Sequence, residues 1–167
     1  GGRGDPSGAA RGEDHPAPAG EVSVTAPLGF RAAGVASGIK PDRLDLALVV
    51  ADGPCASAGV FTSNLAQAAP VLVSREHLLG SRTRAIVANA GCANAATGAA
   101  GLKDAREMAA LTARAAGSPV EEVLVASTGV IGVRLPMEKV RAGIAGAGQR
   151  LSRYAGADAA RAIMTTD

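Results

Sequence analysis

The chain has 167 residues, enough for one domain with a packed core. Its 17 Lys and Arg and 15 Asp and Glu residues are spread along the sequence, and with only 2% aromatic residues they argue against a nucleic-acid partner. No apolar stretch reaches the roughly 18 residues of a membrane span, and the first residues lack the build of a signal peptide, so we expect a cytoplasmic protein that does not enter a membrane.

The first part of the chain predicts a tail followed by strands. Residues 1–20 are rich in Gly, Pro and charged residues without periodicity, which predicts a disordered N-terminal arm. A folded domain is then expected over residues 21–167. Its first strands are expected at Val22–Thr25 and Phe30–Ser37, joined by a turn at Pro27–Gly29.

The middle of the chain predicts the central strands. Leu44–Ala51 (LDLALVVA) is typical of a buried strand, and a turn at Gly53–Pro54 should lead to a short strand at Ala58–Thr62. A short helical segment is expected near Arg75–Leu79. The next strand is expected at Arg84–Asn89 (RAIVAN).

Helices alternate with strands in the last third of the sequence. A helix is expected over Leu102–Ala116, because its apolar residues recur on one face, and a strand over Glu122–Ala126. Pro136 favours the first turn of a second helix, Met137–Ala145, and a last helix should run from Ala157 to the chain end. Strands first and alternating strands and helices afterwards predict an α/β fold, with a mixed sheet packed with helices.

Two predicted strands end in small, polar, glycine-rich loops. The first, Asn89–Gly98 (NAGCANAATG), offers the amides of Asn89 and Asn94, and Gly91 can orient backbone N–H groups freely. These three residues therefore form a candidate active-site loop. The alternative is a tight turn in which the Asn side chains cap the backbone.

The second loop follows the next strand, within Val123–Gly132 (VLVASTGVIG). Here an apolar run leads into Ser127, Thr128 and Gly129, whose hydroxyl and N–H groups could stabilise a developing oxyanion. Neighbours on a strand face opposite ways, so Ser127 is expected to point away from the site. A self-capped turn is again the alternative. Because ligands gather where neighbouring strands end, the two loops together favour a functional site.

The spacing of cysteine and histidine residues argues against metal chemistry. Cys55 and Cys92 form no CxxC motif and are expected to be free thiols. His15 and His77 have no ligand spacing, so no metal site is expected. Cys92 with His77 could act as a nucleophile and base, but a free cysteine is more often a small, buried apolar residue.

Five motifs of this chain occur in the same order in the ornithine acetyltransferases, the glutamate N-acetyltransferases of arginine biosynthesis (the ArgJ family). They are TAPLGFRAAGVASGIK (Thr25–Lys40), AGVFTSN (Ala58–Asn64), NAGCANAATG (Asn89–Gly98), ASTGVIG (Ala126–Gly132) and AIMTTD (Ala162–Asp167). From Val22 to Asp167 the chain thus resembles this family. The resemblance implies a DmpA/ArgJ-like fold, which the self-processing aminopeptidases share.

The resemblance also implies a self-cleaving precursor, of which this chain corresponds to the α chain. The separate β chain would complete the fold and carry the nucleophile, an N-terminal threonine. That threonine would take acetyl from N-acetylornithine and pass it to glutamate, giving ornithine and N-acetylglutamate without a cofactor. A heterotetramer of two α and two β chains is expected, and the α chain alone should be inactive. Some members of the family also use acetyl-CoA as acetyl donor.

Three residues of the chain match functional positions of the family. Thr128 and Gly129 match its oxyanion pair, and Thr165 matches a substrate-contacting position, with Thr166 as its neighbour. Two other enzymes keep related features: a self-processing aminopeptidase or amidase, in which water replaces glutamate, and an acetyltransferase paralogue of secondary metabolism. A non-catalytic binding or scaffold domain is a further alternative.

Overall fold

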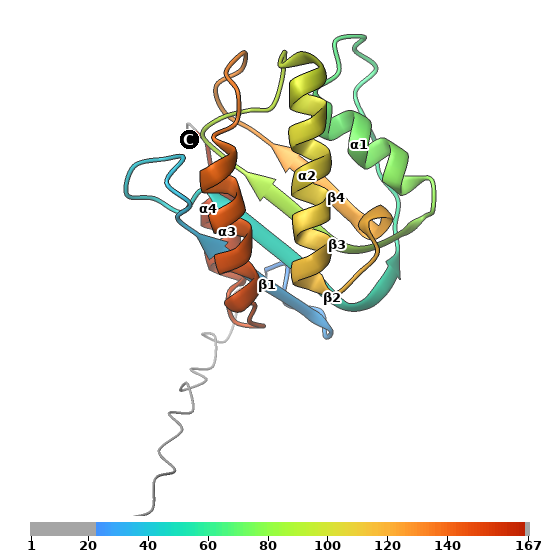
Figure 1. Cartoon of the computed structure of the whole chain (residues 1–167). Coiled ribbons are helices and arrows are strands. Elements are labelled where there is room, and N and C mark those ends of the chain that lie inside the picture. Colours follow the sequence, from blue (N-terminus) through green and yellow to red (C-terminus); the bar gives the residue numbers. More distant parts are fainter. Residues whose placement is uncertain (1–22, 166–167) are drawn as a thin grey trace, which may run out of the picture.

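The structure is a computed structural model that describes residues 23–165, so the predicted arm over residues 1–20 lies outside the described part (Figure 1). A four-stranded sheet with the order β1-β2-β3-β4 forms its centre. The strands are β1 (Phe30–Val35), β2 (Leu46–Ala56), β3 (Arg82–Asn89) and β4 (Val123–Ser127).

The sheet is mixed, as the sequence predicts. β1 with β2 and β2 with β3 are antiparallel, whereas β3 and β4 are parallel. A parallel pair needs a crossover connection, and here the crossover is α2 (Gly98–Ala116) followed by the 3-10 turn η1 (Val120–Glu122). Asn89 and Ser127 lie opposite each other at the ends of β3 and β4. Both glycine-rich loops therefore leave the sheet at the same edge.

Helices cover both faces of the sheet. α2 and α3 (Met137–Gln149) lie over one face, and α4 (Gly156–Ile163) packs on β1 and β2 from the other (Figure 1). Alternate residues of β2 face opposite sides and are buried on both. Leu48 belongs to the large core under α2 and α3, while Ala47 belongs to the small cluster under α4.

The small residues of the sequence permit close packing of α4 on the sheet. Ala159 and Ala162 of α4 are buried against β1 and β2. A Cβ atom at Gly34 of β1 would collide with the backbone of Asp158, so only glycine fits there. With 2% aromatic residues, the chain builds its core from short side chains and brings its elements close together.

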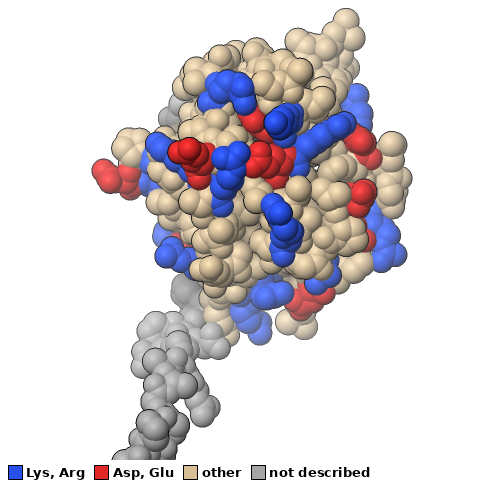
Figure 2. Space-filling model, viewed as in Figure 1, with Lys and Arg blue, Asp and Glu red and all other residues tan. Residues whose placement is uncertain are grey.

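The face that carries α2 and α3 bears charges of both signs. Figure 2 shows Lys and Arg side chains mixed with Asp and Glu side chains over these helices. Arg141 of α3 pairs with Glu107 of α2 at 2.6 Å, and this hydrogen bond lowers the pKa of Glu107. Within residues 23–165, no helix is long and apolar enough to cross a membrane.

Two predicted strands are absent from the structure. In the described part of Val22–Thr25, Ser23 and Thr25 join their hydroxyls at 3.0 Å in a turn, which takes the backbone out of any sheet. Ala58–Thr62 also has no regular structure. β2 instead continues through the predicted turn at Gly53–Pro54 to Ala56, because a bulge after Val50 lets it keep pairing with β3.

Several helix ends differ from the prediction. α1 (Ala69–Leu78) begins before the expected segment near Arg75, because Pro70 fits the first turn of a helix. α2 begins at Gly98 rather than Leu102, while α3 continues past Ala145 to Gln149. α4 ends at Ile163 instead of running to the chain end, because the backbone of Met164 is extended.

Candidate active site

The two glycine-rich loops join into one structure beyond the ends of β3 and β4. We call residues 90–97 the first loop and residues 128–136 the second loop. The N–H of Thr128 donates to the Asn89 carbonyl at 2.9 Å, and the N–H of Val130 donates to the Gly91 carbonyl at 3.4 Å. The Ala93 N–H returns a bond to the Val130 carbonyl at 2.8 Å. The parallel pairing of the strands thus continues into the loops.

The loops approach each other most closely at two glycines. Gly91 has φ +100° and Gly129 has φ +125°, values that other residues rarely adopt. A Cβ atom at Gly129 would collide with the Gly91 carbonyl group and come within 2.6 Å of the Cys92 nitrogen. Glycine is therefore required at position 129 both by its backbone conformation and by the space available.

Thr128 and Gly129 present donors that the described residues leave unused. The Thr128 side chain is exposed, and its hydroxyl makes no hydrogen bond within residues 23–165. The N–H groups of Thr128 and Val130 both point to the first loop. The Gly129 N–H, which lies between them, has no acceptor among the described residues.

Helix α1 packs along the outer edge of β4. The Ser74 hydroxyl accepts from the Val125 N–H and donates to the Val125 carbonyl, both at 2.8 Å. The His77 ring bonds the Val123 carbonyl at 2.7 Å. From His77 to Ser74, α1 runs toward the end of β4, so its N-terminus points toward the second loop. The positive end of the helix dipole adds to the potential that an oxyanion would meet there.

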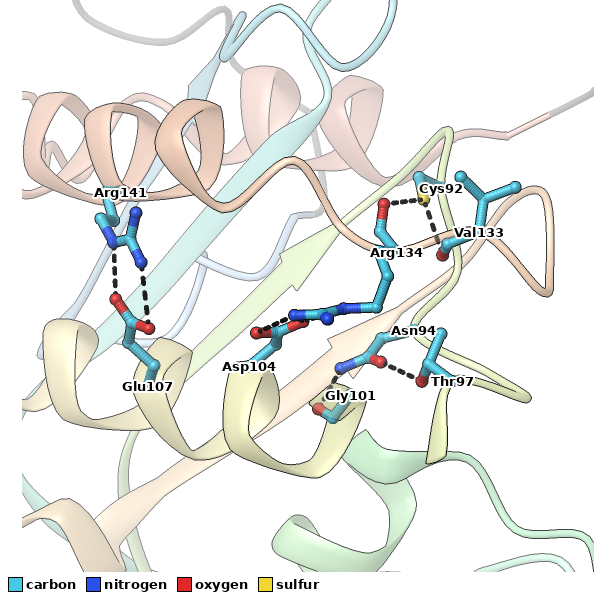
Figure 3. A network of polar contacts seen from close by, with 9 residues as sticks. All are labelled: Cys92, Asn94, Thr97, Gly101, Asp104, Glu107, Val133, Arg134 and Arg141. Carbon is cyan, nitrogen blue, oxygen red and sulfur yellow. Dashed lines mark hydrogen bonds and ion pairs between the residues drawn. The ribbon is translucent and has the colours of Figure 1, made fainter. Parts of the chain in front are cut away.

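The amides of the first loop serve the loop itself. Asn89 and Asn94 are fully buried. The Asn89 amide donates to the Cys92 carbonyl at 2.8 Å, while its buried Oδ1 has no partner among the described residues. The Asn94 amide donates to the Gly101 carbonyl at 2.8 Å and accepts from the Thr97 hydroxyl at 2.6 Å (Figure 3). A catalytic role for Asn89, Gly91 or Asn94 stays a prediction. Their geometry is that of a support for the second loop.

Ser127 and Cys92 join the two loops from the inside. Ser127 was expected to point away from the site. Its hydroxyl instead bonds the first loop: it accepts from the Asn94 N–H at 2.9 Å and donates to the Cys92 carbonyl at 3.2 Å. Burial raises the pKa of the Cys92 thiol, which faces the carbonyls of Val133 and Arg134. Since His77 bonds β4 instead, the structure does not form the alternative cysteine and histidine pair.

The end of the described chain is tied to the same region by Lys40. The Lys40 side chain packs at Gly91, where a Cβ atom would lie 2.7 Å from its Cγ. Its ammonium group donates to the Met164 carbonyl at 2.7 Å. Lys40 and Thr165 also line one cavity of about 230 Å³. The structure thus connects Thr165 to the loop that supports Gly129, whereas Thr166 lies outside the described residues.

Sequence reasoning missed Lys40 and the buried residue that orients it. The carboxylate of Asp45 is fully buried and accepts the N–H groups of Ser37 at 2.7 Å and Lys40 at 2.8 Å. A buried carboxylate is stable only where it is hydrogen-bonded or paired. The single Asp inside the apolar run LDLALVV was a signal for such a role.

A family profile matches most of the chain. The profile of the ArgJ family matches residues 31–167. The chain belongs to the ArgJ family. This membership confirms the resemblance drawn from the sequence motifs.

Curated relatives share about half of the residues over nearly the whole chain. The arginine biosynthesis bifunctional protein ArgJ of Symbiobacterium thermophilum is 54% identical over 147 residues, which cover 86% of this chain and 37% of the relative. The protein of the same name from Thermobifida fusca is 51% identical over 148 residues, covering 87% of this chain and 39% of the relative. The chain therefore spans less than half the length of these relatives.

Solved structures share the fold. The ornithine acetyltransferase of Mycobacterium tuberculosis, crystallised with ornithine, superposes with a TM-score of 0.84 at 50% identity, over 87% of this chain and 80% of that chain. The arginine biosynthesis bifunctional protein ArgJ of Bacillus halodurans gives a TM-score of 0.82 at 39% identity, over 87% and 77% of the two chains. These matches confirm the predicted mixed α/β fold.

Proposed function

We propose that this chain is the α chain of an arginine-biosynthesis acetyltransferase that moves acetyl from N-acetylornithine to glutamate. The observation that carries the proposal is the pair of donors at Thr128 and Gly129, which have no acceptor within residues 23–165 and lie on a loop fixed by its neighbour. Rigid donors aimed at the position of a developing oxyanion are the main requirement of acyl transfer. The ornithine acetyltransferase among the similar structures supports the choice of substrate.

In the proposed reaction, a threonine at the N-terminus of the β chain is the nucleophile. Its hydroxyl attacks the acetyl carbonyl of N-acetylornithine, and its own α-amine takes the proton. The carbonyl oxygen becomes an oxyanion, to which Thr128 and Gly129 donate. The C–N bond then breaks, the amine of ornithine leaves with the proton, and an acetyl ester remains. Attack by the amine of glutamate gives N-acetylglutamate and restores the threonine, so no cofactor takes part.

The proposal includes a β chain from the same precursor and a heterotetramer of two α and two β chains. The lengths of the relatives support division of the precursor into two chains. This sequence covers 80% of the crystallised M. tuberculosis chain but 37% of the S. thermophilum relative. Exposed apolar side chains support a partner, because Val60 is 99%, Leu65 100% and Ile131 65% exposed. We expect the interface to bury roughly 2,000 Å² or more, as permanent complexes do.

Thr165 is proposed as a substrate contact, because Lys40 ties its segment to the first loop. We also propose acetyl-CoA as a second acetyl donor, which the name "bifunctional" of the curated relatives supports. The proposed location is the cytoplasm. The competing activity is hydrolysis by a self-processing amidase; in that case the matured protein would release free acetate from N-acetylornithine instead of forming N-acetylglutamate. A paralogue of secondary metabolism would prefer another acceptor amine to glutamate.

The decisive test is Thr128→Ala in the full-length protein, after mass spectrometry has confirmed a partner chain that begins with threonine. Removal of one oxyanion donor should slow single-turnover acetylation of that threonine by about 10²–10³-fold, roughly 3–4 kcal/mol. The Kd of N-acetylornithine should change little, because the ground-state carbonyl uses the donor less. Thr128→Ser keeps the hydroxyl and should keep most of the activity. A wild-type rate in Thr128→Ala would show that Thr128 is only a turn residue.

A further inference from the structure

The second loop has an anchor that the proposed reaction does not yet explain. Its last part contains Arg134, which lies over α2 (Figure 3). Arg134 donates from Nε and from a terminal nitrogen to the two carboxylate oxygens of Asp104, both at 3.0 Å. Such a two-pronged contact fixes direction as well as distance, because the planar guanidinium matches the carboxylate.

We propose that Arg134 and Asp104 are a positioning pair, which holds the second loop on α2 so that Thr128 and Gly129 stay aimed at the oxyanion. This inference rests on the proposed function. Neither residue touches the reacting atoms; both act through the loop.

Burial makes the pair asymmetric. The Asp104 side chain is 5% exposed, while that of Arg134 is 57% exposed. Among the described residues, Arg134 is the hydrogen-bond partner of the Asp104 carboxylate. A buried carboxylate that has lost water needs a cation and donors, and it is destabilising when left alone. Asp104 therefore draws Arg134, and the loop with it, onto the helix.

The same stretch of α2 also holds the first loop. The carbonyl of Gly101, one turn before Asp104, accepts the amide of Asn94 at 2.8 Å. A Cβ atom at Gly101 would collide with the side chains of Thr97 and Asn94, so the helix and the first loop meet without space between them. Both loops are thus held against the same rigid helix, α2. A shift of the second loop on α2 would move its donors relative to the first loop.

The chain offers a matched control on the same helix. Arg141 makes an equally two-pronged contact with Glu107, at 2.6 and 3.2 Å, one turn beyond Asp104 (Figure 3). Arg141 lies on α3 rather than on the second loop. Both arginines join α2 to another segment, but only Arg134 belongs to the loop with the oxyanion donors.

The experiment compares Arg134→Met with Arg141→Met in the full-length, matured protein. Hydrogen exchange of residues 128–136 reports the anchoring without any need for activity, since the Gly132 N–H donates to the Ala95 carbonyl at 3.0 Å and Val130 donates to Gly91. Arg134→Met should speed this exchange about tenfold. It should slow single-turnover acetylation about tenfold and leave the Kd of N-acetylornithine within about twofold, because misplaced donors weaken the transition state alone. Arg141→Met should match the wild type in all three.

Two further variants keep the proposal falsifiable. Arg134→Lys keeps a cation beside Asp104, so it should fold even where Arg134→Met does not, yet it lacks the fork and should still be slowed. In a Thr128→Ala background, Arg134→Met should slow acetylation by clearly less than the tenfold seen in the otherwise wild-type protein, because one of the two donors that it positions is gone and only the Gly129 N–H remains.

The outcomes separate the two ideas. Three outcomes would each overturn the positioning role. Arg134→Met could match Arg141→Met in exchange and acetylation, or Arg134→Lys could acetylate at the wild-type rate. The third is a double variant in which the effects of Arg134→Met and Thr128→Ala multiply in full. Faster exchange with Thr128→Ala at the wild-type rate would instead remove the oxyanion assignment, and Arg134 would then anchor the loop without serving the reaction.

Discussion

The two loops at the end of the sheet have similar compositions and opposite surroundings. The first loop buries Asn94, whose amide and carbonyl groups are both hydrogen-bonded within the loop and α2. The second loop leaves the Thr128 hydroxyl exposed and the Gly129 N–H without an acceptor in the described part of the chain. In such a pair, the loop with satisfied polar groups is the support, and the loop with free donors is available for chemistry.

The position of each strand explains the difference. β3 lies inside the sheet between β2 and β4, so its loop is enclosed by neighbours on both sides. β4 lies at one edge of the sheet, and Ser74 of α1 bonds its outer side at Val125. Beyond β4, the Gly129 N–H has no acceptor among the described residues. An enclosed loop must satisfy its polar groups internally, whereas an edge loop can offer them to a ligand.

The largest effect should come from adding a side chain at the position where the two loops touch. Gly129→Ala adds a Cβ against the Gly91 carbonyl and forces a non-glycine residue to φ +125°. We expect a loss of at least about 3 kcal/mol in unfolding free energy and failure of the protein to mature. Thermal unfolding and the yield of cleaved protein would measure this.

Gly132→Ala is the control for this prediction. Gly132 has φ +80°, but a Cβ atom there would meet nothing within 4 Å. Only backbone strain remains, and a loss of about 1 kcal/mol is expected. Equal melting temperatures for the two variants would mean that the contact between Gly129 and Gly91 is looser than the structure shows.

The next effect concerns the support loop. Asn94→Ala removes the donor to the Gly101 carbonyl and the acceptor of the half-buried Thr97 hydroxyl, and it empties the space of a fully buried amide. A loss of about 1–3 kcal/mol in unfolding free energy is expected, measured by denaturant titration. Asn64→Ala is the exposed control, since its carbonyl oxygen caps only the Ala66 N–H at the surface. If both variants were equally stable, the first loop would not be the support.

A smaller effect separates two neighbouring hydroxyls. Ser127→Ala removes the acceptor of the Asn94 N–H and a bond to the Cys92 carbonyl, so about 0.5–1.5 kcal/mol of stability should be lost. Thr128→Ala should leave the melting temperature unchanged, because its hydroxyl has no partner among the described residues. The comparison would break down if Thr128→Ala proved the less stable of the two.

The sequence predicted the strands that carry this site better than the separate roles of its two loops. The apolar runs of Leu44–Ala51 and Arg84–Asn89 identified β2 and β3, and the alternation of strands and helices identified the mixed sheet. The strand expected at Ala58–Thr62 is wrong because this segment has no neighbouring strand to pair with in the described part of the chain, and Val60 is 99% exposed. Local pattern shows what a segment can do, but pairing decides whether it becomes a strand.

For a similar reason, the local sequence pattern could not predict the roles of the polar loop residues. Asn94 and Thr128 both follow strands and both sit beside glycine or alanine, so the sequence predicts a site for either. Burial distinguishes them, and burial of Asn94 depends on the turn of α2 at Gly101, which packs directly on it. The anchor from Arg134 to Asp104 joins residues 30 positions apart and has no local signature.

The smallest effect tests whether the support loop stays closed. Cys92 is 8% exposed and its thiol faces the second loop, whereas Cys55 is partly exposed on β2. Burial raises the pKa of Cys92, so the folded protein holds this proton more tightly than the unfolded chain does. The resulting stability is present below the ordinary thiol pKa and is lost as pH rises through the folded value.

Alkylation should therefore be at least about tenfold slower at Cys92 than at Cys55. The alkaline decline in unfolding free energy should be shallower in Cys92→Ala than in Cys55→Ala. Equal labelling of the two thiols in the native protein would show that the first loop opens readily, and the contrast between a closed support loop and a loop with free donors would fail.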